Sequence, residues 1–260
     1  MTFSTQFFTR DPQGLPLIEY LHEGGTKIWF SISSEQTEAF ENFCRNKLPQ
    51  LWTDEFDSVN RLDVMIPIDY LENEGITVTR IVQKPGEFVV LFPGAFHAAF
   101  CTDFCLSECC YFSSSDWLRS AQDIFELSRY HRLPLLFSLE QLLYRIVNSN
   151  EKDQDLHKLA KTKLQNFVKH ALGLRTKLKC IGVPLTTPPQ KPNAVPWSDV
   201  TCDLCEYPCY FTVVFDQDDE IVYCVYHALQ EIQRTGNHTG FTVIYNFPTE
   251  KLAQYSTLDC

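Results

Sequence analysis

The chain has 260 residues, 44% of them hydrophobic, and its 22 basic and 33 acidic residues give a formal net charge of −11. On a prior of about 100 to 200 residues per domain, this length predicts one large domain and a smaller one. The acidic balance argues against general nucleic-acid binding, which relies on basic side chains that neutralise phosphates. The N-terminus carries no basic stretch followed by an apolar run, and no apolar segment approaches the length of a membrane span, so we expect an intracellular protein without membrane contact.

The first half of the chain reads mainly as strands. Residues 27–33 alternate between apolar and polar side chains, which predicts a strand. Ser33 and Gln36 have the spacing of a capping box, so we expect a helix after them. Two β-rich runs, 76–82 and 88–92, are separated by a Pro-Gly pair, and this arrangement predicts a hairpin.

Helices dominate the next part. Apolar residues recur at helical spacing over 115–132, and Ser138 with Gln141 opens another predicted helix. After a polar break, a further helix is expected from about 155 to 172, with Gly173 as its stop. Strands followed by helices predict a mainly β plus α fold, in which a barrel carries a helical appendage.

The last of these predicted helices carries an excess of positive charge. Between 152 and 179 there are eight basic residues against Asp153 and Asp155. The eight are Lys152, Lys158, Lys161, Lys163, Lys169, Arg175, Lys177 and Lys179. They form either an ordinary solvated face or a patch that contacts nucleosomal DNA or an acidic partner surface. The candidates for DNA contact are Lys158, Lys161, Lys163 and Lys169.

A metal-ligand pattern follows a proline-rich segment. Residues 183–196 contain five prolines in fourteen positions, which predicts a stiff linker. Beyond it, Cys202-x-x-Cys205 is separated by eighteen residues from Cys224-x-x-His227. Two chelating pairs with a hairpin-length insert can place four ligands tetrahedrally, as a closed structural zinc site requires. The alternative is that the four are core residues without a metal.

The insert between the chelating pairs and a second group of cysteines can also be interpreted from the sequence. Residues 210–222 contain two hydrophobic runs around a polar centre, so we expect two strands and a turn. A second cysteine group follows no metal-binding spacing, and its members are expected to be small buried apolar residues. This group comprises Cys101, Cys105, Cys109 and Cys110.

Two N-terminal stretches resemble a known family. Residues 86–117 pair a turn-bounded strand with His97 at the start of a second strand, which is the layout of the back half of a cupin-type iron site. Residues 3–29 resemble the strand pair of the front half. Together they resemble the JmjC domain of the Jumonji family, and the runs RDP at 10–12 and IEYLH at 18–22 are most like its founding, Polycomb-associated branch. The resemblance implies a partial JmjC, cupin-type double-stranded β-helix barrel.

The resemblance also locates an iron site with one ligand replaced. A non-haem Fe(II) oxygenase needs two imidazoles and one carboxylate on one face of the metal. Asp11 and His97 stand in matching positions, but Thr9 replaces the first histidine. A hydroxyl is a poor ligand for Fe(II), so we expect only a vestigial iron site of Asp11 and His97.

The residues at the positions that bind the cosubstrate in the family are altered too. Lys27 stands where the family has the lysine that pairs with the 2-oxoglutarate carboxylate. Leu17 and Glu19 occupy positions where the catalytic relatives carry serine and asparagine. A carboxylate at Glu19 would repel a dianion, so 2-oxoglutarate is not expected as a cofactor and Lys27 is interpreted as vestigial. Iron is not expected either, because Thr9 replaces one of its ligands.

The C-terminal cysteines fit the same family. They resemble the Cys/His finger that follows the JmjC domain in Jumonji and in ARID-containing histone demethylases, which implies structural zinc at Cys202, Cys205, Cys224 and His227. Cys209 matches one ligand of a second zinc, but we find no partners for it. The strands before the front half of the iron site, and the JmjN and ARID modules of the family, are not found, so we interpret the chain as a short form or a fragment.

These observations predict four regions and a ranked set of functions. We expect an N-terminally incomplete JmjC-like domain over 1–136, a helical region with a basic face over 137–182, the linker over 183–196 and a zinc-finger domain over 197–260. The first hypothesis is a nuclear, non-catalytic pseudo-demethylase that assists a Polycomb-type histone methyltransferase complex in transcriptional repression. The alternative is an Fe(II)- and 2-oxoglutarate-dependent histone lysine demethylase with an altered ligand set. A third possibility is a decayed gene product with only a folded zinc module.

Overall fold

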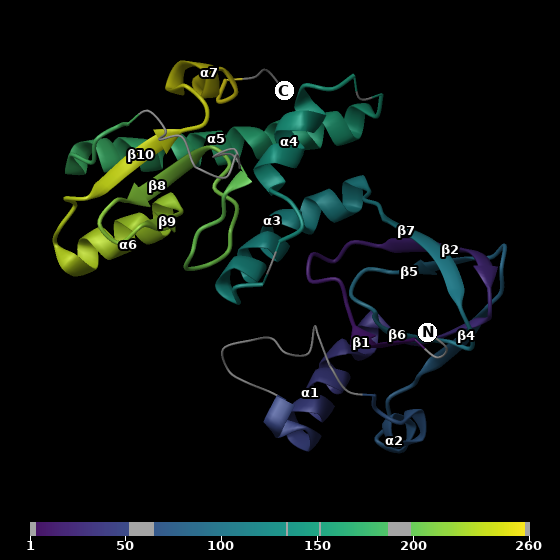
Figure 1. Cartoon of the computed structure of the whole chain (residues 1–260). Coiled ribbons are helices and arrows are strands. Elements are labelled where there is room, and N and C mark those ends of the chain that lie inside the picture. The colour runs from purple at the N-terminus through teal and green to yellow at the C-terminus, as the bar shows by residue number, and fades with distance from the viewer. Residues whose placement is uncertain (1–3, 52–64, 134, 151, 187–198, 258–260) are drawn as a thin grey trace. The chain divides into compact units, whose positions relative to one another are not determined.

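The structure is a computed structural model that describes residues 4–51, 65–133, 135–150, 152–186 and 199–257. The chain divides into two compact units, residues 1–117 and 118–260 (Figure 1). None of the helices in the described segments combines the length and the hydropathy that a membrane span requires.

The first unit contains two antiparallel sheets. Its strands are β1 (Thr5–Thr9), β2 (Leu17–Gly24), β3 (Lys27–Ile32), β4 (Thr79–Gln83), β5 (Phe88–Leu91), β6 (Phe96–Cys101) and β7 (Cys105–Tyr111). One sheet has the order β1-β6-β3-β4 and the other the order β5-β2-β7. The predicted strand at 27–33 is therefore confirmed, and it lies inside the four-stranded sheet between β6 and β4.

The predicted hairpin between β4 and β5 is wrong. β4 pairs with β3, and β5 pairs with β2, so the Pro-Gly turn carries the chain from one sheet to the other. A turn of this kind specifies only a local reversal, whereas the partner of each strand depends on which side chains are buried. Here Gln83 at the end of β4 and both Val89 and Leu91 of β5 are buried.

A glycine-containing turn joins β2 to β3, and through it the chain passes from one sheet to the other. Gly24 has a φ of +108°, and a Cβ on it would come within 2.0 Å of the carbonyl oxygen of Phe104. The amide of Gly25 donates a hydrogen bond to that same oxygen at 2.7 Å. Glycine is required here because the backbones approach so closely. The turn places Glu19 on β2 and Lys27 on β3 in different sheets.

The core of this unit is aromatic and includes the predicted helix. The helix α1 (Thr37–Lys47) buries Phe40 and Phe43 against Phe8 and Phe96. Within the described residues, the predicted capping box does not form. A 3-10 turn, η1 (Ser34–Gln36), precedes α1, and the Gln36 side chain instead accepts a hydrogen bond from the Thr77 amide at 3.0 Å. Two short helical segments complete the unit, η2 (Pro49–Leu51) and α2 (Ile68–Asn73).

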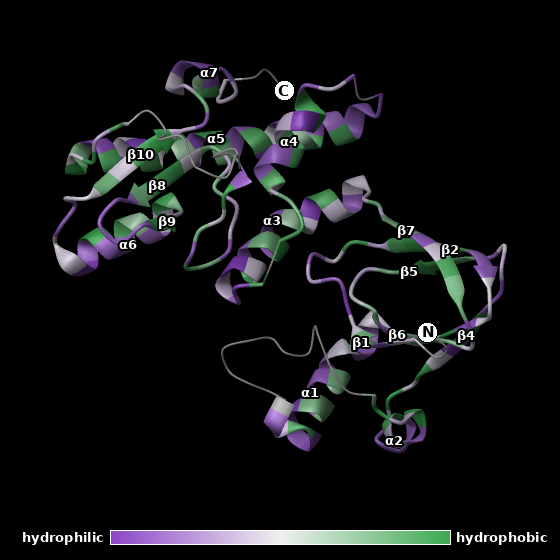
Figure 2. Ribbon diagram, viewed as in Figure 1, coloured by the Kyte–Doolittle hydropathy of each residue, from purple (hydrophilic) through white to green (hydrophobic). Residues whose placement is uncertain are grey.

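The second unit packs helices around a small sheet. Its helices are α3 (Ser115–Tyr130, which starts at the boundary), α4 (Leu139–Val147), α5 (Gln154–Ile181), α6 (Val225–Thr235) and α7 (Thr249–Gln254), and its strands are β8 (Thr212–Asp216), β9 (Ile221–Tyr223) and β10 (Phe241–Tyr245). The predicted pair β8 and β9 is confirmed, and β10 joins it in the order β10-β8-β9. Hydrophilic and hydrophobic residues alternate along α6 (Figure 2), as expected for a helix that buries Val225, Ala228 and Ile232.

The predicted start of one helix is confirmed, whereas the predicted end of another is wrong. The Ser138 side chain accepts a hydrogen bond from the Gln141 amide at 3.2 Å, so the predicted start of α4 is confirmed. The predicted stop at Gly173 is wrong, because α5 continues to Ile181 and ends at Gly182, which has a φ of 96°. A glycine inside a helix costs about 1 kcal/mol relative to alanine. Burial of the Leu178 side chain in the last turn contributes about 1.5 to 3 kcal/mol and so offsets that amount.

The beginning of the predicted linker lies against the sheet. Val183 is buried, and the Pro184 carbonyl accepts a hydrogen bond from the Val243 amide at 2.9 Å. The Thr186 amide donates back to the Val243 carbonyl at 2.9 Å. These residues therefore extend the edge of β10. The rest of the predicted linker, 187–196, lies outside the described residues.

Candidate metal centre and the residues around Lys27

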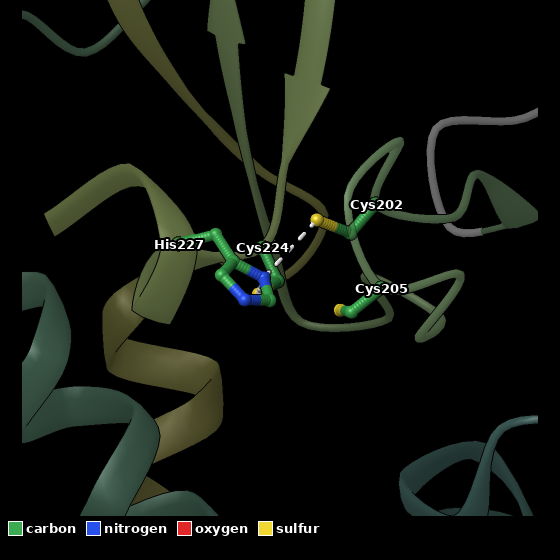
Figure 3. Close-up of side chains that lie close together, drawn as sticks. All are labelled: Cys202, Cys205, Cys224 and His227. Carbon is green, nitrogen blue, oxygen red and sulfur yellow. Dashed lines mark hydrogen bonds between the residues drawn. The ribbon is translucent and has the colours of Figure 1, made fainter. Parts of the chain in front are cut away.

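Four cysteine and histidine side chains converge in the second unit. The ligand atoms of Cys202, Cys205, Cys224 and His227 all lie within 4.8 Å of one another. Cys202 and Cys205 come from the turn before β8, whereas Cys224 caps α6 and His227 lies in its first turn. Figure 3 shows the four side chains pointing toward one another. The two chelating pairs of the sequence are thus brought together.

Two distances from His227 are close to those between the ligands of a tetrahedral metal. His227 Nδ1 is 3.6 Å from Cys202 Sγ and 3.3 Å from Cys224 Sγ. Zinc bonds of about 2.3 Å to sulfur and about 2.0 to 2.1 Å to nitrogen place tetrahedral ligand atoms about 3.5 Å apart. The three cysteines are buried, and hydrogen bonds from Cys205 and Cys224 lower the pKa of Cys202. The cluster could therefore hold a metal such as zinc.

Main-chain hydrogen bonds hold the turn that carries the first pair. The Cys202 amide donates to the Tyr207 carbonyl at 3.0 Å, and the Glu206 amide donates to the Cys202 carbonyl at 2.8 Å. Asp203 Oδ2 accepts from the Val222 amide at 2.6 Å, which ties the turn to β9. Two thiols are therefore oriented by the fold itself, as an oriented ligand shell requires.

Cys209 lies beside this cluster. Among the described residues, the group of potential ligands comprises only the four named above. The Cys209 thiol is buried and donates to the Tyr207 carbonyl at 3.7 Å. Burial raises the pKa of Cys209 well above its ordinary value, so the neutral thiol is favoured.

In the first unit, Asp11 forms a turn. Its Oδ1 accepts hydrogen bonds from the amides of Gln13 at 3.1 Å and Leu15 at 2.7 Å. Burial raises the pKa of Asp11, and these two hydrogen bonds oppose the rise. The side chain therefore shapes the chain between β1 and β2, which is the common role of aspartate in such turns.

His97 lies on β6, directly opposite Thr9. The two residues are partners in the antiparallel register of β1 and β6, and His97 is also paired with Ser31 of β3. The imidazole is buried, with Nδ1 3.5 Å from the Ala95 carbonyl oxygen, and burial lowers the pKa of His97. The structure thus places Thr9 and His97 opposite each other on neighbouring strands.

The residues at these positions do not fit the iron triad. Thr9, Asp11 and His97 offer one hydroxyl, one carboxylate and one imidazole, whereas Fe(II) oxygenases use two imidazoles and a carboxylate. One Asp11 oxygen is already bonded to two backbone amides. Within the described residues, no group of three or more potential ligands forms around Asp11 and His97.

Lys27 is engaged by a carboxylate of the same chain. Its Nζ lies 2.7 Å from Glu19 Oε1 and 2.9 Å from Oε2, and the side chains are only 11% and 7% exposed. The cation also lies 4.2 Å from the centre of the Trp29 ring. Sequence reasoning expected Glu19 to repel a dianionic ligand and did not foresee this pairing. Leu17 packs with Trp29, Val89 and Leu91 in a small apolar cluster.

Arg175 belongs to the core and not to the basic face. It is 3% exposed, and its guanidinium donates to the Phe211 carbonyl at 2.7 Å and the Phe247 carbonyl at 2.9 Å. The signal that could have identified it is position, because Leu164, Val168, Arg175 and Leu178 share one stripe of α5. The other seven basic residues are exposed or partly exposed, and Lys163 donates to the Arg119 carbonyl at 2.9 Å.

Comparisons with known proteins agree with the resemblance. Residues 1–112 match the family described as "JmjC domain, hydroxylase". Protein Jumonji of Gallus gallus is 27% identical over 270 residues, covering 97% of this chain and 22% of that protein. Lysine-specific demethylase JMJ17 of Arabidopsis thaliana is 34% identical over 133 residues, covering 51% of this chain and 11% of that protein. Lysine-specific demethylase JMJ703 of Oryza sativa subsp. japonica is 31% identical over 143 residues, covering 55% and 12%.

The chain spans less than a quarter of the length of each of these relatives. Protein Jumonji aligns with both units, whereas the family match covers only the segment that contains the two sheets of the first unit. Residues 1–112 thus match a JmjC domain, and over nearly its whole length the chain is similar to Protein Jumonji.

Proposed function

We propose that the protein is a non-catalytic chromatin regulator of the Jumonji type, which acts in the nucleus and assists a Polycomb-type histone methyltransferase complex in transcriptional repression. Two observations support the non-catalytic part: the residue opposite His97 and the ion pair of Lys27. Thr9 takes the place of an iron-binding imidazole, and Glu19 holds the lysine that would bind the cosubstrate. The partner complex follows from the resemblance to the Polycomb-associated branch of the family.

The alternative is an Fe(II)- and 2-oxoglutarate-dependent histone lysine demethylase. Asp11, His97 and Lys27 favour it, and two relatives are named lysine-specific demethylases. Purified protein loaded anaerobically with Fe(II) decides between the two. We expect elemental analysis to find about one zinc and little iron per chain, and mass spectrometry to find methylated histone peptides unchanged after incubation with 2-oxoglutarate. Demethylation by this chain would refute the first proposal.

We further propose that the metal at Cys202, Cys205, Cys224 and His227 is structural zinc. Four protein ligands leave no coordination position for a substrate, so the ion would contribute to folding and not to a reaction. The carbonyl and carboxylate bonds that hold the Cys202 turn support this role, because they orient the ligands from the protein side.

The exposed face of α5 is proposed to contact nucleosomal DNA. Lys158 and Lys169 are exposed, and their cations would release counterions from phosphates. Changing Lys158, Lys161, Lys163 and Lys169 together to glutamine should weaken binding to nucleosomes and flatten its dependence on salt. Binding with an unchanged salt slope would assign these lysines to solvent.

A further inference from the structure

A buried ion pair, Glu19 with Lys27, joins the two sheets of the first unit. Glu19 lies on β2, between β5 and β7, and Lys27 lies on β3, between β4 and β6. Their ion pair therefore joins the two sheets through their inner strands. Both carboxylate oxygens lie within hydrogen-bond distance of the same ammonium group, at 2.7 and 2.9 Å.

Neighbouring residues hold this pair in place. The buried Gln83 accepts a hydrogen bond from Trp29 Nε1 at 2.8 Å and donates to the main-chain carbonyl of Glu19 at 3.3 Å. Gln83 also donates to the Glu87 carbonyl at 3.1 Å, so it ties β4 to the start of β5. Trp29, which is 1% exposed, lies under the lysine cation. Lys27 is thus in contact with the Glu19 carboxylate and the Trp29 ring, and the Gln83 side chain fixes the backbone at Glu19.

We propose that Glu19 is an internal ligand of Lys27, which takes the place that a carboxylate cosubstrate would occupy and so excludes 2-oxoglutarate from Lys27. The inference deepens the non-catalytic proposal, on which it rests for the role of Lys27. A second carboxylate can bind Lys27 only if Glu19 leaves. Removal of the Glu19 carboxylate would leave a shielded ammonium group without its anion, and such a group attracts a replacement anion from solution.

The test uses the full chain with its zinc retained and with no Fe(II) added, so that no iron contributes to binding. The probe is 2-oxoglutarate, measured by calorimetry and by the shift in thermal midpoint. Glu19→Asn shortens and neutralises the side chain, and should bind 2-oxoglutarate at least about tenfold more tightly than the parent does, the scale of one regained hydrogen bond to a charged group. The thermal midpoint of Glu19→Asn should rise with 2-oxoglutarate concentration, while that of the parent should not.

Two matched variants distinguish the effect of the space that a shorter side chain leaves from the effect of the Lys27 charge. Glu19→Gln removes the charge but keeps the length, so it fills the site and should not gain affinity. The double variant Glu19→Asn with Lys27→Met has the space but lacks the cation, and should also not respond. A folded Glu19→Asn variant that ignores 2-oxoglutarate, or a parent that binds it equally well, overturns the proposal.

A measurement on the parent alone covers the case in which Glu19→Asn does not fold. Acetylation of lysines by an activated ester, read by mass spectrometry, should modify Lys27 at least about tenfold more slowly than the exposed Lys158, because a paired and buried amine reacts slowly. Equal rates would overturn the proposal. Demethylation by the parent would refute the function proposed above, whereas these binding and labelling results concern only the Glu19 and Lys27 pair.

Discussion

Arg175 offers the sharpest test of how the second unit is held together. Its guanidinium donates to oxygens at the start of β8 and just after β10: Nη2 to the Phe211 carbonyl, Nε to the Thr212 hydroxyl at 2.8 Å and Nη1 to the Phe247 carbonyl. It also lies 3.8 Å from the centre of the Tyr245 ring. One side chain of α5 therefore links β8, β10 and the loop after β10.

The change Arg175→Met keeps an unbranched stem but removes every donor. The two carbonyls lose a hydrogen bond each, and a buried group left unsatisfied costs about 1 to 3 kcal/mol. Loss of the cation over Tyr245 adds about 1 to 2 kcal/mol. Methionine regains the desolvation of the guanidinium, since burial already lowers the pKa of Arg175 to about 10. We expect a net loss of about 3 kcal/mol from a total stability of about 5 to 15 kcal/mol.

Native-state hydrogen exchange is the appropriate assay, because two units need not unfold together. Peptides from β8 and the end of α5 should exchange roughly a hundredfold faster in Arg175→Met. Lys177→Met is the matched control, since it removes a cation from an exposed position of the same helix and should stay within about 0.5 kcal/mol of the parent. Arg175→Lys should lose nearly as much as methionine, because an ammonium cannot reach all four oxygens that the guanidinium bonds, which include the Thr249 hydroxyl. Equal exchange in Arg175→Met and Lys177→Met would refute the reasoning.

Three further predictions concern the two sites and their surroundings. Cys205→Ser should abolish zinc binding and make residues 199–257 protease-sensitive, because lost metal affinity is lost folding energy; a variant that keeps its metal and its resistance would contradict the ligand assignment. Burial raises the pKa of Glu140, which accepts a hydrogen bond from Tyr207 at 3.0 Å. The folded state then holds this proton more tightly than the unfolded state, so stability should fall as pH rises from 4.5 through the folded pKa. Glu140→Gln should remove that slope in denaturation measured from pH 4 to 8, and an unchanged slope would assign the dependence to other groups. Thr9→His should raise iron affinity, measured by Fe(II) titration, yet leave methylated histone peptides intact because Glu19 still holds Lys27; demethylation by this single variant would show that Thr9 is the whole defect.

Local chemistry in the sequence determined several features of this protein. The spacing of Cys202, Cys205, Cys224 and His227 specified two chelating pairs, and a short loop lets each pair point at one centre. The hydroxyl of Ser138 specified the start of α4 because its hydrogen bond reaches only three residues along the chain. Such features depend on contacts within a few residues, so they can be predicted without knowledge of the fold.

Other features were decided only by the tertiary structure. The sequence showed Glu19 and Lys27 as opposing charges eight positions apart, and their pairing depends on the Gly24 turn that places β2 and β3 in different sheets. Arg175 reads as one more cation in a basic run until β8 and the loop after β10 supply its acceptors. In each case the partner lies on another element, and its distance is set by sheet pairing and core packing, which a local pattern does not encode.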